Sequence, residues 1–299
     1  MKPCVFIHTN DRQRVGAAVA EHALRRNSAR AGDFDIRIIR REDHPFFDAR
    51  EGQRYRRDGG WRTWRNDDLQ SFTPLRFLPP ELMGYRGRAL VIDPDIFAIG
   101  DVWELLARDM GGKAIACRRR SGSKRKNCFA SSVMLLDCAQ LRHWRCEEAF
   151  AELFTGERDY ADWICLRLEP QDSIGPLEDE WNHFDRLTPQ TKLLHNTRRW
   201  TQPWKTGLPV DFVPADQIGW LPGASWLMRK RREWFGDYAL LGRYVRHPDP
   251  AQERMFFSLL RECVEAGAVS ESLLREEIER MHLRRDAIEV MRGAAPLPA

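Results

Sequence analysis

Apolar and polar positions along the chain form short strand-like runs separated by helix-like segments. Residues 4–9 are mostly apolar, residues 13–27 place apolar side chains at helical spacing, and residues 34–39 alternate with a period of two. These segments predict a β-α-β start. Apolar runs at residues 89–92 and 128–137 predict further strands, with helix-like segments after each. Strands separated by helices indicate an α/β fold.

Two regions depart from this alternation. Residues 43–69 are polar, rich in Arg and Trp, and contain Gly59-Gly60, which predicts a long surface excursion or lid. Residues 249–291 have the pattern of two long amphipathic helices broken near Gly267, with no strand. We therefore expect an α/β domain over residues 1–210 and a mainly helical C-terminal extension over residues 211–299.

Composition adds limits on compartment and partners. The chain has 299 residues, of which 42% are hydrophobic and 31% charged, as in ordinary globular proteins. No apolar run approaches the roughly 18 to 20 residues of a membrane span, and no signal-peptide pattern is present, so we expect a cytoplasmic protein. Its seven cysteines form no Cys-x-x-Cys pair, and an odd number fits poorly with a disulfide framework, so reduced thiols are expected.

A pair of aspartates marks the end of the apolar run at residues 89–92. Asp93 and Asp95 are separated by Pro94. Successive side chains of a strand point to opposite faces, so the two carboxylates converge only if the chain leaves strand geometry, as Pro94 favours. Converging carboxylates are typical ligands of a hard divalent ion such as Mg²⁺ or Mn²⁺. The alternative is a polar turn after a strand.

A second polar cluster lies at residues 191–207. His195 follows Leu193 and Leu194, as if it too ended a buried segment, and Lys205 comes soon after. An imidazole ligand favours Mn²⁺ over Mg²⁺, and a lysine can contact a phosphate as a point charge. The alternative for His195 is a hydrogen-bonded structural histidine.

The order of these motifs resembles that of the family-8 retaining glycosyltransferases, which include glycogenin and bacterial lipopolysaccharide galactosyltransferases. The shared features are the β-α-β start, the arginine in SFTPLRFLPP, the strand that ends in Asp93-x-Asp95, the strand FASSVMLLD, and a late His195 followed by PWK. The resemblance covers roughly residues 1–210. It implies a GT-A fold, meaning a Rossmann-like mixed sheet flanked by helices, and a nucleotide-sugar donor, with a UDP-sugar as one candidate.

The resemblance also implies roles for nine residues of this chain. Those that would hold a divalent metal are Asp93, Asp95 and His195. Those that would bind the donor are Thr9, Asn10 and Asp11 at the nucleoside, Arg76 at the donor and Lys205 at the diphosphate. The candidates for catalysis beside the sugar are Asp162 and Arg76.

Several positions depart from the family pattern. Ala130 stands where an amide is expected to contact the donor sugar, and Trp163 stands where relatives often have Gln. Arg12 replaces an aromatic residue that often stacks on uracil, so the base is open. Trp163 suggests a narrower or more apolar sugar pocket.

The function expected from these features is metal-dependent, hexosyltransferase-like transfer of a sugar to a hydroxyl of a cell-surface or lipid-linked glycan, retaining by resemblance. Two alternatives stay open. One is a nucleic-acid-binding protein that uses basic patches interleaved with tryptophan; the net charge of +4 and the absence of a binding motif make it the weaker hypothesis. The other is an inactive relative or a phosphohydrolase built on the same aspartates.

Two basic clusters bear on partners. Residues 118–127 carry six cations among ten residues, typical of a solvated loop or of a site for an anionic acceptor or donor phosphate. Residues 225–238 mix Trp226, Leu227, Trp234 and Phe235 with the cations at 229–232. This pattern is typical of a packed surface helix or of a helix at an anionic membrane surface, and predicts peripheral association with the inner membrane face.

Overall fold

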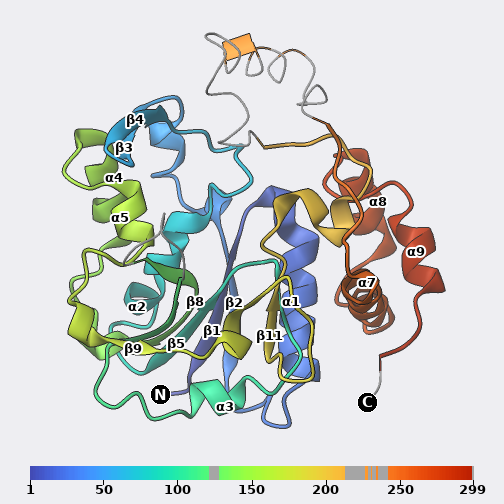
Figure 1. Cartoon of the computed structure of the whole chain (residues 1–299), viewed down its shortest axis with the longest axis horizontal. Helices are drawn as coiled ribbons and strands as arrows, with labels where there is room; N and C mark the ends of the chain where they lie inside the picture. Colours follow the sequence, from blue (N-terminus) through green and yellow to red (C-terminus); the bar gives the residue numbers. More distant parts are fainter. Residues whose placement is uncertain (121–127, 213–225, 228–229, 231–233, 235–241, 298–299) are drawn as a thin grey trace. The chain divides into compact units, whose positions relative to one another are not determined.

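The computed structural model describes residues 1–120, 128–212, 226–227, 230, 234 and 242–297 (Figure 1). It divides into two compact units, Met1–His195 and Asn196–Ala299. The boundary expected at residue 210 therefore falls inside the second unit.

The first unit is built on a six-stranded mixed sheet. Its strands, in spatial order, are β2 (Asp35–Arg40), β1 (Cys4–Thr9), β5 (Arg88–Ile92), β8 (Phe129–Asp137), β7 (Ile115–Arg119) and β9 (Ile174–Pro176). β1 runs parallel to β2 and β5, β8 runs antiparallel to β5 and β7, and β9 is parallel to β7. A mixed sheet flanked by helices was predicted, and the structure confirms it (Figure 1).

The helices of this unit are short except for the first. They are α1 (Arg14–Arg26), α2 (Pro79–Leu82), α3 (Trp103–Leu106), α4 (Cys146–Thr155) and α5 (Tyr160–Ile164), with 3-10 turns at η1 (Asp11–Gln13), η2 (Arg41–Asp43), η3 (Asp48–Arg50), η4 (Thr73–Phe77), η6 (Cys138–Gln140), η7 (Gln171–Ser173) and η8 (Asp179–Asn182). α1 contacts both β1 and β6, and its buried residues include Val15, Val19 and Leu24.

Two smaller sheets complete the first unit. One joins β10 (His183–Phe184), β11 (Leu193–His195) and β6 (Ile96–Ala98), so that residues late in this unit lie beside the segment that follows β5. The other is the hairpin of β3 (Arg54–Arg57) and β4 (Gly60–Thr63). This hairpin lies within the predicted excursion at residues 43–69, which therefore has secondary structure of its own.

The second unit is helical in its described part, apart from one bridge between Pro209 and Arg243. Its helices are α7 (Pro250–Glu265), α8 (Glu271–Glu279) and α9 (Ala287–Gly293), with 3-10 turns at η9 (Arg199–Thr201) and η10 (Pro203–Lys205). The prediction of two long helices was wrong, because the chain also breaks after α8, where Met281 adopts a positive φ of 57°. The predicted break at Gly267 is present, with a φ of 72°.

A disulfide joins Cys128 to Cys165, so the expectation of seven reduced thiols was wrong. The two cysteines are 37 residues apart, and they meet because the backbone N–H of Phe129 donates to the carbonyl of Cys165, which brings the start of β8 to the end of α5. Such a tertiary contact leaves no trace in cysteine spacing. The other five cysteines are buried and form no disulfide. No helix in the described part of the chain has the length and apolar character needed to cross a membrane.

Candidate metal centre

The Asp93-Pro94-Asp95 turn is formed where β5 ends. β5 ends at Ile92, and the N–H of Ile96 donates to the carbonyl of Asp93 at 3.2 Å, so the chain turns before β6 begins. Gly16 of α1 lies against this turn, and a Cβ at that position would be 2.7 Å from the carbonyl oxygen of Pro94. A side chain there would collide with backbone, so glycine is what allows α1 to approach the turn.

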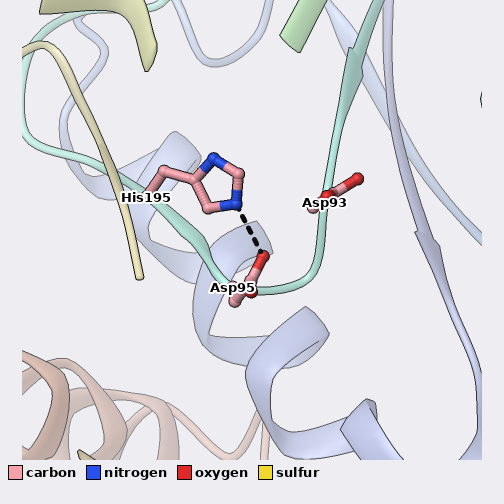
Figure 2. Close-up of side chains that lie close together, drawn as sticks. All are labelled: Asp93, Asp95 and His195. Carbon is pink, nitrogen blue, oxygen red and sulfur yellow. Dashed lines mark ion pairs between the residues drawn. The ribbon is translucent and has the colours of Figure 1, made fainter. Parts of the chain in front are cut away.

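Strand pairing brings His195 to this turn. In the antiparallel pair of β11 and β6, His195 lies opposite Ile96, the residue after Asp95. Nε2 of His195 is 3.5 Å from Oδ1 of Asp95, and one donor atom from each of Asp93, Asp95 and His195 lies within 4.8 Å of the other two (Figure 2). The predicted convergence of these side chains is confirmed.

Asp93 is held from two further elements. The guanidinium of Arg76 in η4 forms a bidentate pair with it, Nε to Oδ1 at 3.0 Å and Nη2 to Oδ2 at 2.5 Å. Nε2 of His8, at the end of β1, lies 2.5 Å from Oδ1. Nη1 of Arg76 donates to Oγ of Ser131 at 2.9 Å, and that hydroxyl donates to the carbonyl of Ile164. The carboxylate of Asp93 is thus fixed by groups on β1 and η4.

The surroundings shift the pKa values of the two aspartates in opposite directions. Burial opposes ionisation of Asp93, but the charges of Arg76 and His8 and the hydrogen bond from His8 hold its pKa below the usual range. Burial and the negative charge of Asp93 raise the pKa of Asp95 well above the usual range. A divalent cation between them would favour the ionised form of Asp95, because it would replace repulsion by attraction.

His195 is oriented by Asn182, which lies at the end of η8. Nδ1 of His195 is 2.8 Å from Oδ1 of Asn182, and Nδ2 of Asn182 donates to Oγ of Ser132 at 3.0 Å. Because the amide oxygen accepts, Nδ1 carries the proton and the lone pair of Nε2 faces Asp95. Burial lowers the pKa of His195 to about 3, so the ring is neutral, as metal ligation requires.

The donor set fits a divalent transition metal. The site offers two carboxylates and a neutral imidazole, whose orientation is set by a hydrogen bond to its other nitrogen. These ligands are typical of Mn²⁺, and the carboxylate oxygens can also bind Mg²⁺. Sequence reasoning missed His8 and Asn182. Asn182 is 13 residues before His195, and nothing in that spacing signals a partnership.

The residues predicted to bind the nucleoside lie at the end of β1 and directly after it. Thr9 and Asn10 are buried. The amide nitrogen of Asn10 donates to the carbonyls of Asp68 and Leu69 and to Oγ of Ser71, so this side chain ties the end of β1 to the segment before η4. Asp11 pairs with Arg40 at 2.5 Å. Their contacts with a nucleoside stay a prediction.

Apart from Arg76 on η4, the residues predicted beside the sugar lie on α5 and β8. Asp162 is partly exposed and pairs with Arg167 at 2.8 Å. Trp163 is buried and stacks on Phe77 with ring centroids 4.5 Å apart. Ala130 of β8 is buried and offers its carbonyl to Nδ2 of Asn182 at 3.4 Å.

Lys205 belongs to the second unit. Its side chain is fully buried, and Nζ is 2.5 Å from Oδ2 of Asp211, which also accepts from the hydroxyl of Tyr244. The predicted role of Lys205 at a diphosphate stays a prediction.

The two basic clusters are described only in part. Arg118 and Arg120 lie with their guanidinium carbons 4.3 and 5.5 Å from the ring centre of Phe184, while residues 121–127 lie outside the described residues. Of the segment at 225–238, Trp226, Leu227 and Trp234 are exposed, and most of the cations at 229–232 lie outside the described residues.

Comparison with known proteins gives likenesses to solved structures only. No family model and no curated protein matches the chain. The glycosyltransferase GlyE of Streptococcus pneumoniae TIGR4 is 16% identical with a TM-score of 0.49, over 90% of this chain and 64% of that one. The galactosyltransferase LgtC, solved with donor and acceptor sugar analogs, is 15% identical with a TM-score of 0.46, over 67% and 89% of the two chains. Mouse xyloside xylosyltransferase 1 is 14% identical with a TM-score of 0.44, over 66% and 98%. This chain thus spans 64% of the length of GlyE, and all three of these similar structures are glycosyltransferases.

Proposed function

We propose that this chain is a divalent-metal-dependent glycosyltransferase that moves a sugar from a nucleotide-sugar donor to a hydroxyl acceptor. The observation that carries the proposal is the cluster of Asp93, Asp95 and His195, whose donor atoms lie within 4.8 Å of one another although the sequence separates the histidine widely from the aspartates. The cluster lies where the parallel strands β1 and β5 end, the edge at which α/β sheets bind ligands.

The three residues of this cluster share one task, and two neighbouring residues support them. Asp93, Asp95 and His195 hold the cation, and Arg76 and Asn182 keep two of these ligands in place. When bound, Mn²⁺ or Mg²⁺ supplies Lewis-acid stabilisation of the negative charge that develops on a leaving nucleoside diphosphate. The protein contributes fixed, buried ligands, so little reorganisation is needed when that charge forms.

The donor-binding roles follow the resemblance to family-8 glycosyltransferases. We place Thr9, Asn10 and Asp11 at the nucleoside, for which a UDP-sugar is one candidate donor. Arg76 and Asp162 border the sugar. The ion pair of Asp162 with Arg167 is exposed, and such pairs contribute little, so a sugar hydroxyl can take the place of Arg167. Retention of anomeric configuration is likewise carried over from the resemblance.

Lys205 is proposed at the diphosphate, but its contacts make Lys205→Ala a poor test. Removing a fully buried ammonium leaves Asp211 without its ion-pair partner, which destabilises proteins by roughly 3 to 5 kcal/mol. Loss of nucleotide binding in that variant would therefore report unfolding as readily as a lost contact. Lys205→Arg, which keeps the charge, is the better substitution.

The acceptor is proposed to be a hydroxyl of a cell-surface or lipid-linked glycan. Exposed Trp226, Leu227 and Trp234 beside a run of cations support a location at an anionic membrane surface.

A thermal-shift panel of sugar nucleotides, with and without Mn²⁺, tests the proposal. A ligand that binds only the folded protein raises its stability by about 2.7 kcal/mol at a hundred times its Kd, so a matching donor should raise Tm, and only when Mn²⁺ is present. The protein should also release nucleoside diphosphate slowly by hydrolysis of that donor. This release should be faster when an acceptor is present. Release of inorganic phosphate without acceptor would instead indicate a phosphohydrolase. Salt-dependent binding to DNA with no response to Mn²⁺ or nucleotide would contradict the proposal.

A further inference from the structure

The hairpin of β3 and β4 presents two chemically different faces. Arg56 lies opposite Trp61 and Arg54 opposite Thr63, so alternation places Arg54, Arg56 and Trp61 on one face. Asp58 and Gly59 form the two-residue turn, both with positive φ, 53° and 72°.

The opposite face anchors the hairpin to the first unit. Tyr55 is only 6% exposed, and its ring centre lies 5.5 Å from that of Trp64 and 5.6 Å from that of Tyr160. Both carboxylate oxygens of Asp159 accept from the turn, from the N–H of Asp58 at 3.1 Å and from that of Gly59 at 2.9 Å. The outward face is therefore held in a defined position at the start of α5.

The outward face combines an exposed indole with uncompensated cations. Trp61 is 40% exposed, and the guanidinium carbons of Arg54 and Arg56 lie 5.8 and 5.9 Å from its ring centre. Neither arginine forms an ion pair with a carboxylate among the described residues, whereas Arg62 pairs with Asp58 and Arg65 pairs with Glu51. Residues 50–65 contain six arginines and two acids, a formal +4 that equals the net charge of the whole chain.

These groups fit an acidic glycan. Guanidinium groups bind carboxylates and phosphates through paired hydrogen bonds, and an exposed aromatic ring gives a flat apolar surface for the CH face of a sugar. A single-stranded nucleic acid is the weaker fit, because proteins that bind it use several aromatic side chains for successive bases. This face offers one.

The hairpin lies at the end of the sheet that carries the metal cluster. In Figure 1 it lies beyond the end at which β1 leads into α1, and β5, which runs parallel to β1, ends in Asp93 on the same side. α5 connects the two regions: its N-terminal Asp159 holds the hairpin turn, and the carbonyl of Ile164 accepts from Ser131, which in turn accepts from Arg76.

We propose that the face formed by Arg54, Arg56 and Trp61 binds the acceptor as a negatively charged glycan, bearing carboxylates or phosphates, outside the donor site. This inference rests on the proposed function in that it identifies the bound glycan as the acceptor. Binding of a glycan to this face is tested without the reaction.

Titration calorimetry of the full chain with defined oligosaccharides tests the proposal. The probes are an oligogalacturonate, a phosphorylated oligomannoside, a neutral maltooligosaccharide of matched length, and a single-stranded oligonucleotide of matched charge. We expect binding of an acidic oligosaccharide that weakens with salt and exceeds that of the neutral one. Arg54→Gln/Arg56→Gln and Trp61→Ala should each weaken it by about tenfold or more, the scale of one lost charge-assisted or stacking contact.

The matched control is Arg62→Gln/Arg65→Gln. It removes the same charge from the same segment but from arginines that already have carboxylate partners, so binding should fall by no more than about twofold to threefold. Equal losses in both double variants would overturn the proposal, because general charge would then explain binding, and so would tighter binding of the oligonucleotide. All variants should keep the parent's Mn²⁺ response in Tm. If the Tm of the parent itself does not respond to Mn²⁺, that result would instead contradict the proposed function.

Discussion

Nδ1 of His195 lies 2.8 Å from Oδ1 of Asn182, and this hydrogen bond sets which nitrogen of the ring faces Asp95. Asn182→Leu keeps much of the volume but removes the acceptor, so the ring is free to turn or to change tautomer. Loss of such an outer partner lowers metal affinity by about 10-fold to 100-fold. Mn²⁺ titration followed by electron paramagnetic resonance measures this directly.

Asn182→Asp is the matched control. A carboxylate accepts from Nδ1 as the amide oxygen does, so Mn²⁺ affinity should stay within about threefold of the parent value or increase. If Asn182→Leu binds Mn²⁺ as tightly as the parent, the hydrogen bond has no part in orienting His195.

Asp95→Asn should change stability and metal binding in opposite directions, raising the first at higher pH and weakening the second. The pKa of Asp95 is raised in the folded protein by burial and by Asp93, so its protonated form stabilises the fold and this contribution is lost as pH rises through the raised pKa. Without metal, the neutral amide should therefore match the parent at low pH and exceed its stability at higher pH.

The same substitution should remove the response to Mn²⁺. In the parent, a proton on Asp95 competes with the metal, so affinity should increase as pH rises through the raised pKa of this group. Melting curves in EDTA and in Mn²⁺ across a pH series measure both effects. A Mn²⁺-dependent rise in Tm as large in Asp95→Asn as in the parent would exclude Asp95 as a ligand.

Much of the sheet and the two aspartates of the metal cluster could be predicted from the sequence because these parts have strong local signals. The buried strand before Asp93 is a continuous apolar run, and Pro94 marks the turn. His195 could be placed beside the aspartates only through family resemblance, since the pairing of β11 with β6 has no local signature. The role of Asn182 depends on that tertiary contact as well, and the role of His8 depends on the pairing of β1 with β5.

Features created by tertiary packing were the ones missed. The Cys128–Cys165 bond depends on the contact between β8 and α5. The break after α8 was missed because Met281 is an ordinary helix former and only the folded backbone shows its positive φ. The hairpin of β3 and β4 was read as an excursion because Gly59-Gly60 signals a turn while the flanking arginines mask the strands.

Gly16→Ala should disturb the metal centre although Gly16 is not one of its ligands. Replacement of a helical glycine by alanine usually stabilises a helix by about 1 kcal/mol. Here the added Cβ would lie 2.7 Å from the carbonyl oxygen of Pro94, so α1 and the Asp93–Asp95 turn must move apart. We expect a lower Tm and weaker Mn²⁺ binding. Gly293→Ala, in α9 with nothing within 4 Å of the new Cβ, is the control and should leave both unchanged or raise Tm slightly.

Reduction of the Cys128–Cys165 disulfide should lower stability. Opening a loop of 37 residues costs about 3 to 4 kcal/mol in the chain-entropy model, so Cys128→Ser/Cys165→Ser should melt well below the oxidised parent. Thiol titration of the denatured, non-reduced protein checks the pairing itself. Five thiols per chain are expected, and seven would show that the bond does not form under those conditions.

The last prediction concerns association with membranes, and it rests on the cations at residues 229–232 beside exposed Trp226, Leu227 and Trp234. Each cation near an anionic bilayer contributes about 1 kcal/mol, so four give reversible binding that salt screens. We expect the parent to cosediment with anionic vesicles and not with neutral ones. A variant with all four cations changed to Gln should lose most of this binding.

A control variant distinguishes this segment from general positive charge. The four arginines at positions 118, 119, 142 and 145 have the same total charge and lie elsewhere in the sequence, so their change to Gln should leave vesicle binding largely intact. Equal losses in the two variants would show that binding follows net charge. The exposed tryptophans would then have no specific role at the bilayer, because aromatic insertion requires the segment that carries them to lie against the headgroups.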